Sequence, residues 1–138
     1  MKIYLDASVL VPIFVDDDWT PQVGAWLATK PEVLVSDWTL AEFSSALSLH
    51  VRRGRLTPEE RDGAENALND WVAGVIEVAP VLDEDVVHAR LALHRHPKLR
   101  TPDALHLAMV LRLGQAFASY DEDLVEAARR DGIEVVTP

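Results

Sequence analysis

The segment Ile3-Tyr4-Leu5-Asp6-Ala7-Ser8 decides the expected fold, because an uninterrupted apolar run ends there in an acid and two small residues. A short apolar run without polar alternation is typical of a strand that helices cover on both faces. Four more short runs follow along the chain, so the sequence predicts five strands. These are Ile3–Leu5, Val33–Ser36, Val75–Val78, Ala116–Ser119 and Glu134–Val136.

Helical patterns separate the predicted strands. Thr20, Thr57 and Thr101 each precede a proline; threonine supplies an N-cap oxygen, and proline suits the first helical position. Apolar residues spaced three or four apart predict further helices. These cover about Trp38–Arg53, Asp83–Arg95 with Val86, Ala89 and Leu93 inward, and Asp123–Arg130. The alternation predicts an α/β protein with a mostly parallel sheet, in one domain over residues 1–138.

Composition narrows the function classes. The chain has no cysteine, which excludes a disulfide framework, a thiolate zinc site and a cysteine nucleophile. No apolar run approaches the ~20 residues that span a bilayer, and the N-terminus lacks the features of a signal peptide. We therefore expect a cytoplasmic protein without a membrane segment.

The basic residues are concentrated, although the formal net charge is −10. Strong negative charge opposes nonspecific binding to phosphate backbones. Eight of the thirteen Lys and Arg residues nevertheless fall in two short segments, which are either solvated helix ends or a grip for phosphates. The members that we take as candidates for binding the phosphates of a nucleic acid are Arg52, Arg53, Arg55, Arg95, Lys98 and Arg100.

Four acids are conspicuous for their positions. Asp6 and Asp121 follow predicted strands, and Glu42 lies just inside the helix after the second strand. The carboxyl ends of parallel strands share one edge, where ligands bind. Asp103 opens the helix leading into the fourth strand, and we expect that helix to start at the opposite edge unless it crosses the sheet obliquely. Sheet geometry alone therefore gathers three of the four acids, and each acid taken singly is also explained as a cap or a solvated side chain.

Carboxylates that share a small cleft need a counter-charge. An all-oxygen donor set without cysteine or paired histidine favours Mg²⁺ or Mn²⁺ over zinc. Such ions bind one or two carboxylates and complete their coordination with water and substrate phosphates. The chemistry that this pattern indicates is hydrolysis of a phosphoester.

Four motifs along the whole chain resemble the PIN-domain family, and within it the VapC-like toxin ribonucleases of bacterial and archaeal toxin–antitoxin pairs. The motifs are Tyr4–Leu10, Ala41-Glu42, Thr101–Ala108 and Ser119-Tyr120-Asp121. The resemblance implies a three-layer α/β/α sandwich with strand order 3-2-1-4-5, which makes Asp6 and Asp121 neighbours and places Asp103 in the same pocket. It further implies an Mg²⁺- or Mn²⁺-dependent endoribonuclease, a VapB-like antitoxin and a homodimer.

The resemblance also assigns roles. Asp6, Glu42, Asp103 and Asp121 fall on the family's acidic metal ligands, with Asp6 and Asp103 central. Ser119 stands where threonine is common, so Ser119 and Ser8 are expected to hold the carboxylates through their hydroxyls. Asp123 is a possible extra ligand.

Three other readings compete with a nuclease. A haloacid-dehalogenase-type phosphatase needs a second Asp two residues after the first, where this chain has Ser8. A phosphoacceptor receiver domain needs paired early acids and a late lysine, but Lys98 is the last lysine. The third is a PIN-like fold that only binds a partner. We expect His106, one turn after Asp103, to pack or to support the site, and Trp26 and Trp71 to be structural.

Overall fold

The computed structural model describes residues 1–138, with the side chain of residue 75 left out. Its centre is a parallel sheet of five strands in the order β3-β2-β1-β4-β5. The strands are β1 (Ile3–Leu5), β2 (Val33–Ser36), β3 (Glu77–Ala79), β4 (Ala116–Ala118) and β5 (Val135–Val136). The predicted α/β class and strand order are confirmed.

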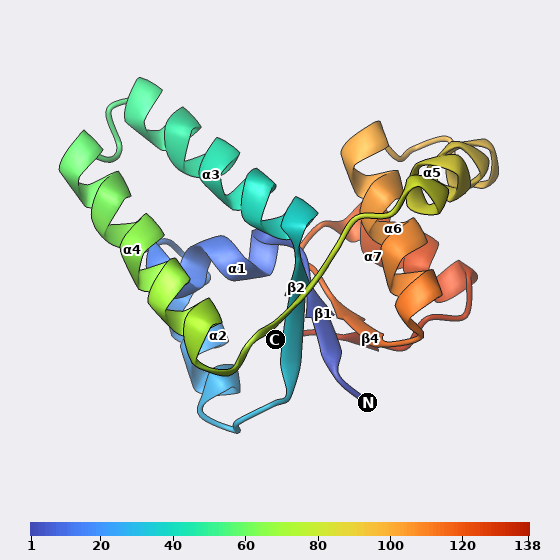
Figure 1. Ribbon diagram of the computed structural model, residues 1–138, viewed down its shortest axis with the longest axis horizontal. Coiled ribbons are helices and arrows are strands. Elements are labelled where there is room, and N and C mark those ends of the chain that lie inside the picture. Colours follow the sequence, from blue (N-terminus) through green and yellow to red (C-terminus); the bar gives the residue numbers. More distant parts are fainter.

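Helices cover both faces of the sheet, so the protein has three layers (Figure 1). α1, α2, α3 and α4 lie on one face, with α3 and α4 forming a long hairpin; α5, α6 and α7 lie on the other. The helices are α1 (Ala7–Phe14), α2 (Thr20–Leu27), α3 (Asp37–Arg52), α4 (Pro58–Val75), α5 (Asp83–Arg95), α6 (Thr101–Leu113) and α7 (Glu122–Arg130).

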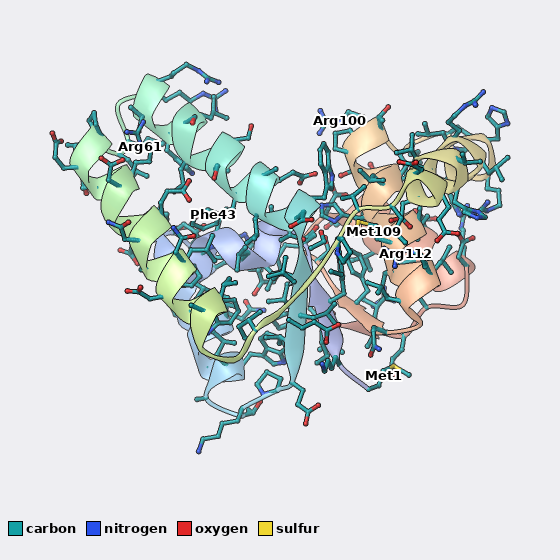
Figure 2. The ribbon with its side chains drawn as sticks, in the orientation of Figure 1. Met1, Phe43, Arg61, Arg100, Met109 and Arg112 are labelled. Atoms are coloured by element: carbon teal, nitrogen blue, oxygen red, sulfur yellow. The ribbon has the colours of Figure 1, made fainter. Side chains whose placement is uncertain are left out.

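The central strands divide the hydrophobic core in two, because successive side chains point to opposite faces. Tyr4 of β1 pairs in register with Leu34 and Phe117, and all three face α5, α6 and α7. Leu5 faces the other way, into the core that holds Phe43 of α3 (Figure 2). Trp26 and Trp71 pack against that second core and are structural, as predicted.

Helix starts confirm one of three predicted threonine caps. Thr57 caps α4 through a capping box with Glu60. Thr20 and Thr101 are instead the first residues of their helices, so that prediction is wrong. The Thr20 hydroxyl donates to the Pro12 carbonyl at 2.8 Å, and the carbonyl of Arg100, not Thr101, accepts the first hydrogen bond of α6.

Several boundaries differ from expectation. β3 starts at Glu77 rather than Val75, because α4 continues through Val75; β4 and β5 are each one residue shorter. α1 was not predicted from the sequence, although five of its eight residues are buried. Val86 is 52% exposed rather than inward, because α5 turns Asp85, Ala89 and Ala92 towards the core. No helix in the described part of the chain combines the length and apolar character that crossing a membrane requires.

Candidate functional site

Asp6 lies at the centre of the carboxyl edge of the sheet, where the strand order reverses between β1 and β4. It is 4% exposed. Its carboxylate caps α1 by accepting hydrogen bonds from the backbone N–H groups of Ser8 at 3.1 Å and Val9 at 3.3 Å. The strand end and the helix start therefore fix this acid from two sides.

Two serines bind Asp6 and connect it to the chain after β4. The Ser8 hydroxyl donates to Asp6 Oδ1 and the Ser119 hydroxyl to Asp6 Oδ2, each at 2.6 Å. Ser119 Oγ in turn accepts the N–H of Asp121 at 2.9 Å, and Ser8 Oγ accepts that of Tyr120 at 2.9 Å. Both serines thus contact the carboxylate that the sequence assigned to them.

Burial dominates the electrostatics of Asp6. It raises the pKa of this carboxyl above its ordinary value, although the two serine hydroxyls act in the opposite direction. The native fold therefore keeps this carboxylate charged at a cost, as expected where a cation or a proton completes a site.

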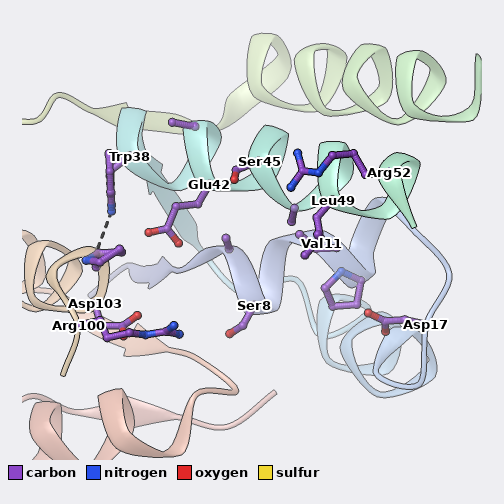
Figure 3. Close-up of a pocket in the computed structure, with 15 residues that line it drawn as sticks. Ser8, Val11, Asp17, Trp38, Glu42, Ser45, Leu49, Arg52, Arg100 and Asp103 are labelled. Atoms are coloured by element: carbon purple, nitrogen blue, oxygen red, sulfur yellow. Dashed lines mark hydrogen bonds between the residues drawn. The ribbon is translucent and has the colours of Figure 1, made fainter. Parts of the chain in front are cut away.

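A cleft of about 690 Å³ opens beside Asp6. Its lining residues include Ser8, Trp38, Glu42, Arg52, Arg100 and Asp103. Figure 3 shows Glu42 of α3 and Asp103 of α6 reaching into the same end of the cleft, with Arg100 beside Asp103. The Trp38 indole N–H donates to the Pro102 carbonyl at 3.2 Å and joins the starts of α3 and α6.

The expectation that α6 starts at the opposite edge is wrong. α6 precedes β4, and a helix packed antiparallel to the strand that follows it begins at the carboxyl edge, not the amino edge. No oblique crossing is needed. Asp103 therefore faces Glu42 across the cleft.

Asp103 and Asp121 complete the acidic cluster. Burial raises the pKa of Asp103, and the negative charges of Asp121 and Glu42 raise it further, against the opposing effect of Arg100. Asp121 also caps α7, accepting the N–H of Leu124 at 3.1 Å. The structure thus places Glu42 and Asp103 on the cleft, Asp121 near enough to raise the pKa of Asp103, and Asp6 behind Ser8 of the cleft wall. The cap that explained Asp121 alone is real, yet the charge of Asp121 still acts on Asp103.

Glu42 lies next to His106, a buried residue whose contact with Glu42 the sequence did not predict. His106 Nε2 lies 3.2 Å from Glu42 Oε1. Both atoms are buried, and neither makes a well-formed hydrogen bond with any described residue. His106 is 1% exposed, and its place one turn after Asp103 was the only sequence signal for this contact.

The remaining predicted residues separate into two groups. Arg52 and Arg100 line the cleft. The others do not line the cleft. Arg53 follows α3, and Arg55 lines a different hollow. Arg95 pairs with Asp131, Lys98 lies 3.9 Å from Glu126, and exposed Asp123 lines a third hollow together with Lys98.

The acidic cluster suits a hard cation that keeps several bound waters better than a cation that protein ligands coordinate completely. Among the described residues, no three His, Asp or Glu side chains are grouped so that they alone could hold a metal ion. Zinc sites require three or four protein ligands, whereas Mg²⁺ keeps several waters and takes one or two carboxylates. The raised pKa of Asp103 is what such an ion would relieve.

Comparisons with known proteins agree with this architecture. The PIN domain profile matches residues 3–130. Ribonuclease VapC23 of Mycobacterium tuberculosis is 33% identical over 87 residues, which cover 62% of this chain and 69% of that protein.

Solved structures show the same fold at lower identity. The VapC20 toxin of Mycobacterium tuberculosis, described as cleaving the sarcin–ricin loop, has a TM-score of 0.72 at 23% identity, covering 91% of this chain and 95% of that one. VapBC2 of Rickettsia felis, solved on a promoter DNA fragment, has a TM-score of 0.70 at 12% identity, covering 100% and 99%. On the profile match and the shared fold, the chain belongs to the PIN-domain family and is similar within it to VapC ribonucleases.

Proposed function

We propose that this chain is an Mg²⁺- or Mn²⁺-dependent endoribonuclease and the toxin of a VapBC-type pair, with residues 1–138 forming one PIN domain. The observation that carries the proposal is that Glu42 and Asp103 line one cleft, where the charges of Asp121 and Glu42 raise the pKa of Asp103, and that buried Asp6 lies behind Ser8 of the cleft wall. The similarity to Ribonuclease VapC23 supports RNA as the substrate. Membership of the PIN family disfavours the phosphatase and receiver alternatives.

Asp6 and Asp103 are the proposed central ligands, and Glu42 and Asp121 complete the site directly or through water. Asp6 has room for this role because three of its four hydrogen bonds go to Oδ1, so that Oδ2 accepts only the Ser119 hydroxyl and keeps a lone pair. Ser8 and Ser119 orient the carboxylate. A bound Mg²⁺ or Mn²⁺ would lower the pKa of a coordinated water and offset the charge of the phosphate oxygens.

We expect the basic residues that line the cleft to bind the RNA backbone. Arg100 lies beside Asp103, and Arg52 lies at the other end on α3 (Figure 3). Guanidinium groups bind phosphate oxygens in a bidentate fashion. Two such groups on either side of the acids would hold the backbone across the cleft.

The proposed partners follow from relatives rather than from contacts in this chain. VapBC2 of Rickettsia felis and a toxin–antitoxin complex of Klebsiella pneumoniae share the fold over the whole chain. We infer a VapB-like antitoxin, a homodimer and a cytoplasmic location for this protein too. Size determination of the purified protein, alone and after co-expression with a candidate VapB-like antitoxin, tests the dimer and the partner.

The decisive experiment is RNA cleavage by the purified protein with Mg²⁺, Mn²⁺ or EDTA. We expect cleavage with either ion, none with EDTA, and a loss of at least about 100-fold in Asp6→Asn and Asp103→Asn. Asp62→Asn is the matched control, because this exposed acid on α4 pairs with Arg61 and is none of the candidate ligands. Equal cleavage by wild type and both cleft variants would identify a contaminant and leave the binding-only reading of the fold.

A further inference from the structure

A chain of buried polar groups runs beneath the cleft and ends at Glu42. The Tyr4 hydroxyl lies 2.7 Å from Ser36 Oγ and 2.8 Å from His106 Nδ1. The opposite nitrogen of the same ring, Nε2, faces Glu42 Oε1 at 3.2 Å. Tyr4, Ser36 and His106 are each at most 1% exposed, so these groups can satisfy one another but not exchange with bulk water.

The direction of the hydrogen bonds can be worked out from the donors available. Thr39 uses its one hydroxyl hydrogen on the Leu5 carbonyl at 2.9 Å, and Ser36 Oγ already accepts the Thr39 N–H at 3.0 Å. The Ser36 hydrogen can go to Tyr4 at 2.7 Å or to Thr39 Oγ1 at 3.1 Å, and the shorter contact favours Tyr4, which then gives its own hydrogen to His106 Nδ1. A neutral imidazole that accepts at Nδ1 carries its hydrogen on Nε2.

The reverse direction places two acceptors against each other. If Nδ1 carried the hydrogen of a neutral ring and donated it to Tyr4, the lone pair of Nε2 would face the Glu42 carboxylate. A buried acceptor without a donor costs about 1–3 kcal/mol. The direction from Ser36 through Tyr4 to His106 avoids this cost and gives Glu42 Oε1 its nearest donor.

We propose that His106 is a positioning residue that holds the Glu42 carboxylate in the cleft through its Nε2–H, and that Tyr4 fixes the tautomer that makes this possible. The inference rests on the proposed nuclease function for its effect on catalysis, but not for the contact itself. Glu42 has a 26% exposed side chain on a helix surface, and binding one oxygen to His106 leaves the other directed at the cleft. An acid ordered in this way loses less conformational freedom when an ion binds.

The variants separate this role from simple packing. His106→Leu removes the donor at similar volume, His106→Gln returns an N–H near the same place, and Tyr4→Phe leaves the histidine but removes the group that selects its tautomer. The matched control is His96→Leu, since His96 is also buried, at 8% exposure, but binds Asp131 at 2.9 Å far from Glu42. We expect His106→Leu to lower kcat/KM 10- to 100-fold, as removal of outer-shell partners does, and His106→Gln to recover part of it.

Two readouts do not depend on RNA cleavage. In ¹⁵N–¹H spectra of the ion-free wild type, His106 should be the Nε2–H tautomer, and Tyr4→Phe should convert it into a mixture. The Mg²⁺ concentration that half-saturates the rise in melting temperature should increase in His106→Leu but not in His96→Leu. An Nδ1–H tautomer in the wild type, or an unchanged Mg²⁺ midpoint in folded His106→Leu, would overturn the proposal. A wild type that cleaves no RNA but shows the Nε2–H tautomer and the shifted midpoint would refute the nuclease function and leave the positioning role intact.

Discussion

Replacing Asp6 by Ala should lower the stability of the ion-free protein, whereas replacing it by Asn should not, because the two substitutions remove different parts of one site. Asn keeps an oxygen for the N–H groups of Ser8 and Val9, which are 3.1 and 3.3 Å from Asp6 Oδ1. Its amide group can donate to Ser119 Oγ, which has a lone pair left after accepting from Asp121. Ala removes the cap and leaves both serine hydroxyls without their acceptor.

The magnitudes follow from these contacts. Losing the charge weakens the two serine hydrogen bonds by about 1 kcal/mol each, whereas an unpaired buried carboxylate costs several kcal/mol. The raised pKa of Asp6 shows that burial outweighs the bonds, so Asn should leave the ion-free protein between unchanged and about 2 kcal/mol more stable. Ala should cost about 1 kcal/mol for the cap and about 1–3 kcal/mol for unpaired hydroxyls.

Thermal unfolding in EDTA at pH 7 measures both effects. About 1 kcal/mol corresponds to roughly 3 °C for a chain of this length, so we expect Asp6→Ala to melt several degrees below wild type and Asp6→Asn to melt no lower than wild type. Both variants should lose the rise in melting temperature that Mg²⁺ gives the wild type. An Asn variant that falls as far as the Ala variant would show that the carboxylate charge stabilises the ion-free fold, and would refute the reasoning.

Three further predictions concern other acids and the basic lining. Burial, Asp121 and Glu42 raise the pKa of Asp103, so the charged carboxylate lowers the stability of the fold above that pKa, and this penalty disappears as the pH falls through it. Asp103→Asn should therefore melt at a higher temperature than wild type at pH 7 in EDTA. The difference in melting temperature should shrink when the same comparison is made at lower pH. Asp85→Ala should lower the free energy of unfolding in urea by about 3 kcal/mol, because Asp85 is 1% exposed and binds Arg112 at 2.7 and 2.9 Å. The control is Asp83→Ala, at an exposed acid of the same helix. Equal losses of stability in the two variants would show that the Asp85–Arg112 pair does not stabilise the fold. Arg100→Ala should weaken RNA binding and lower the slope of log Kd against log salt by about 1 in filter binding, whereas an unchanged slope would exclude Arg100 from phosphate contact.

Local sequence signals predicted the elements that depend on local chemistry. The unbroken apolar runs predicted a parallel sheet, and its order β3-β2-β1-β4-β5 followed from the family resemblance. The N-cap predicted at Thr57 appears in the structure, and the last predicted helix ends at Arg130 as expected, two residues before Gly132 with its φ of 81°. Such features need only neighbouring residues, so a sequence contains all the information that they require.

The failures have a common cause in contacts between distant segments. Periodicity placed Val86 inward, but Asp85 of the same turn binds Arg112 of α6 and rotates α5 so that Val86 is 52% exposed. The cap expected of Thr101 moved to Arg100. The wrong edge for Asp103 was an error of topology rather than of missing information, since any helix packed antiparallel to its following strand starts where the preceding strand ended.

The charge balance of the cleft links ion binding to substrate binding. Asp17, Glu42 and Asp103 line the cleft, whereas only Arg52 and Arg100 among the described basic residues do, and the chain carries a net charge of −10. Without a cation, a phosphate entering beside Glu42 and Asp103 meets more negative than positive charge, so the two arginines alone do not make the site attractive to RNA. A cation bound by the acids would make the local charge positive where the reacting phosphate lies, and would leave the rest of the surface acidic. On the proposed function, RNA affinity should therefore rise with Mg²⁺ concentration in the wild type, and the acidic remainder of the surface would disfavour RNA held anywhere but in the cleft.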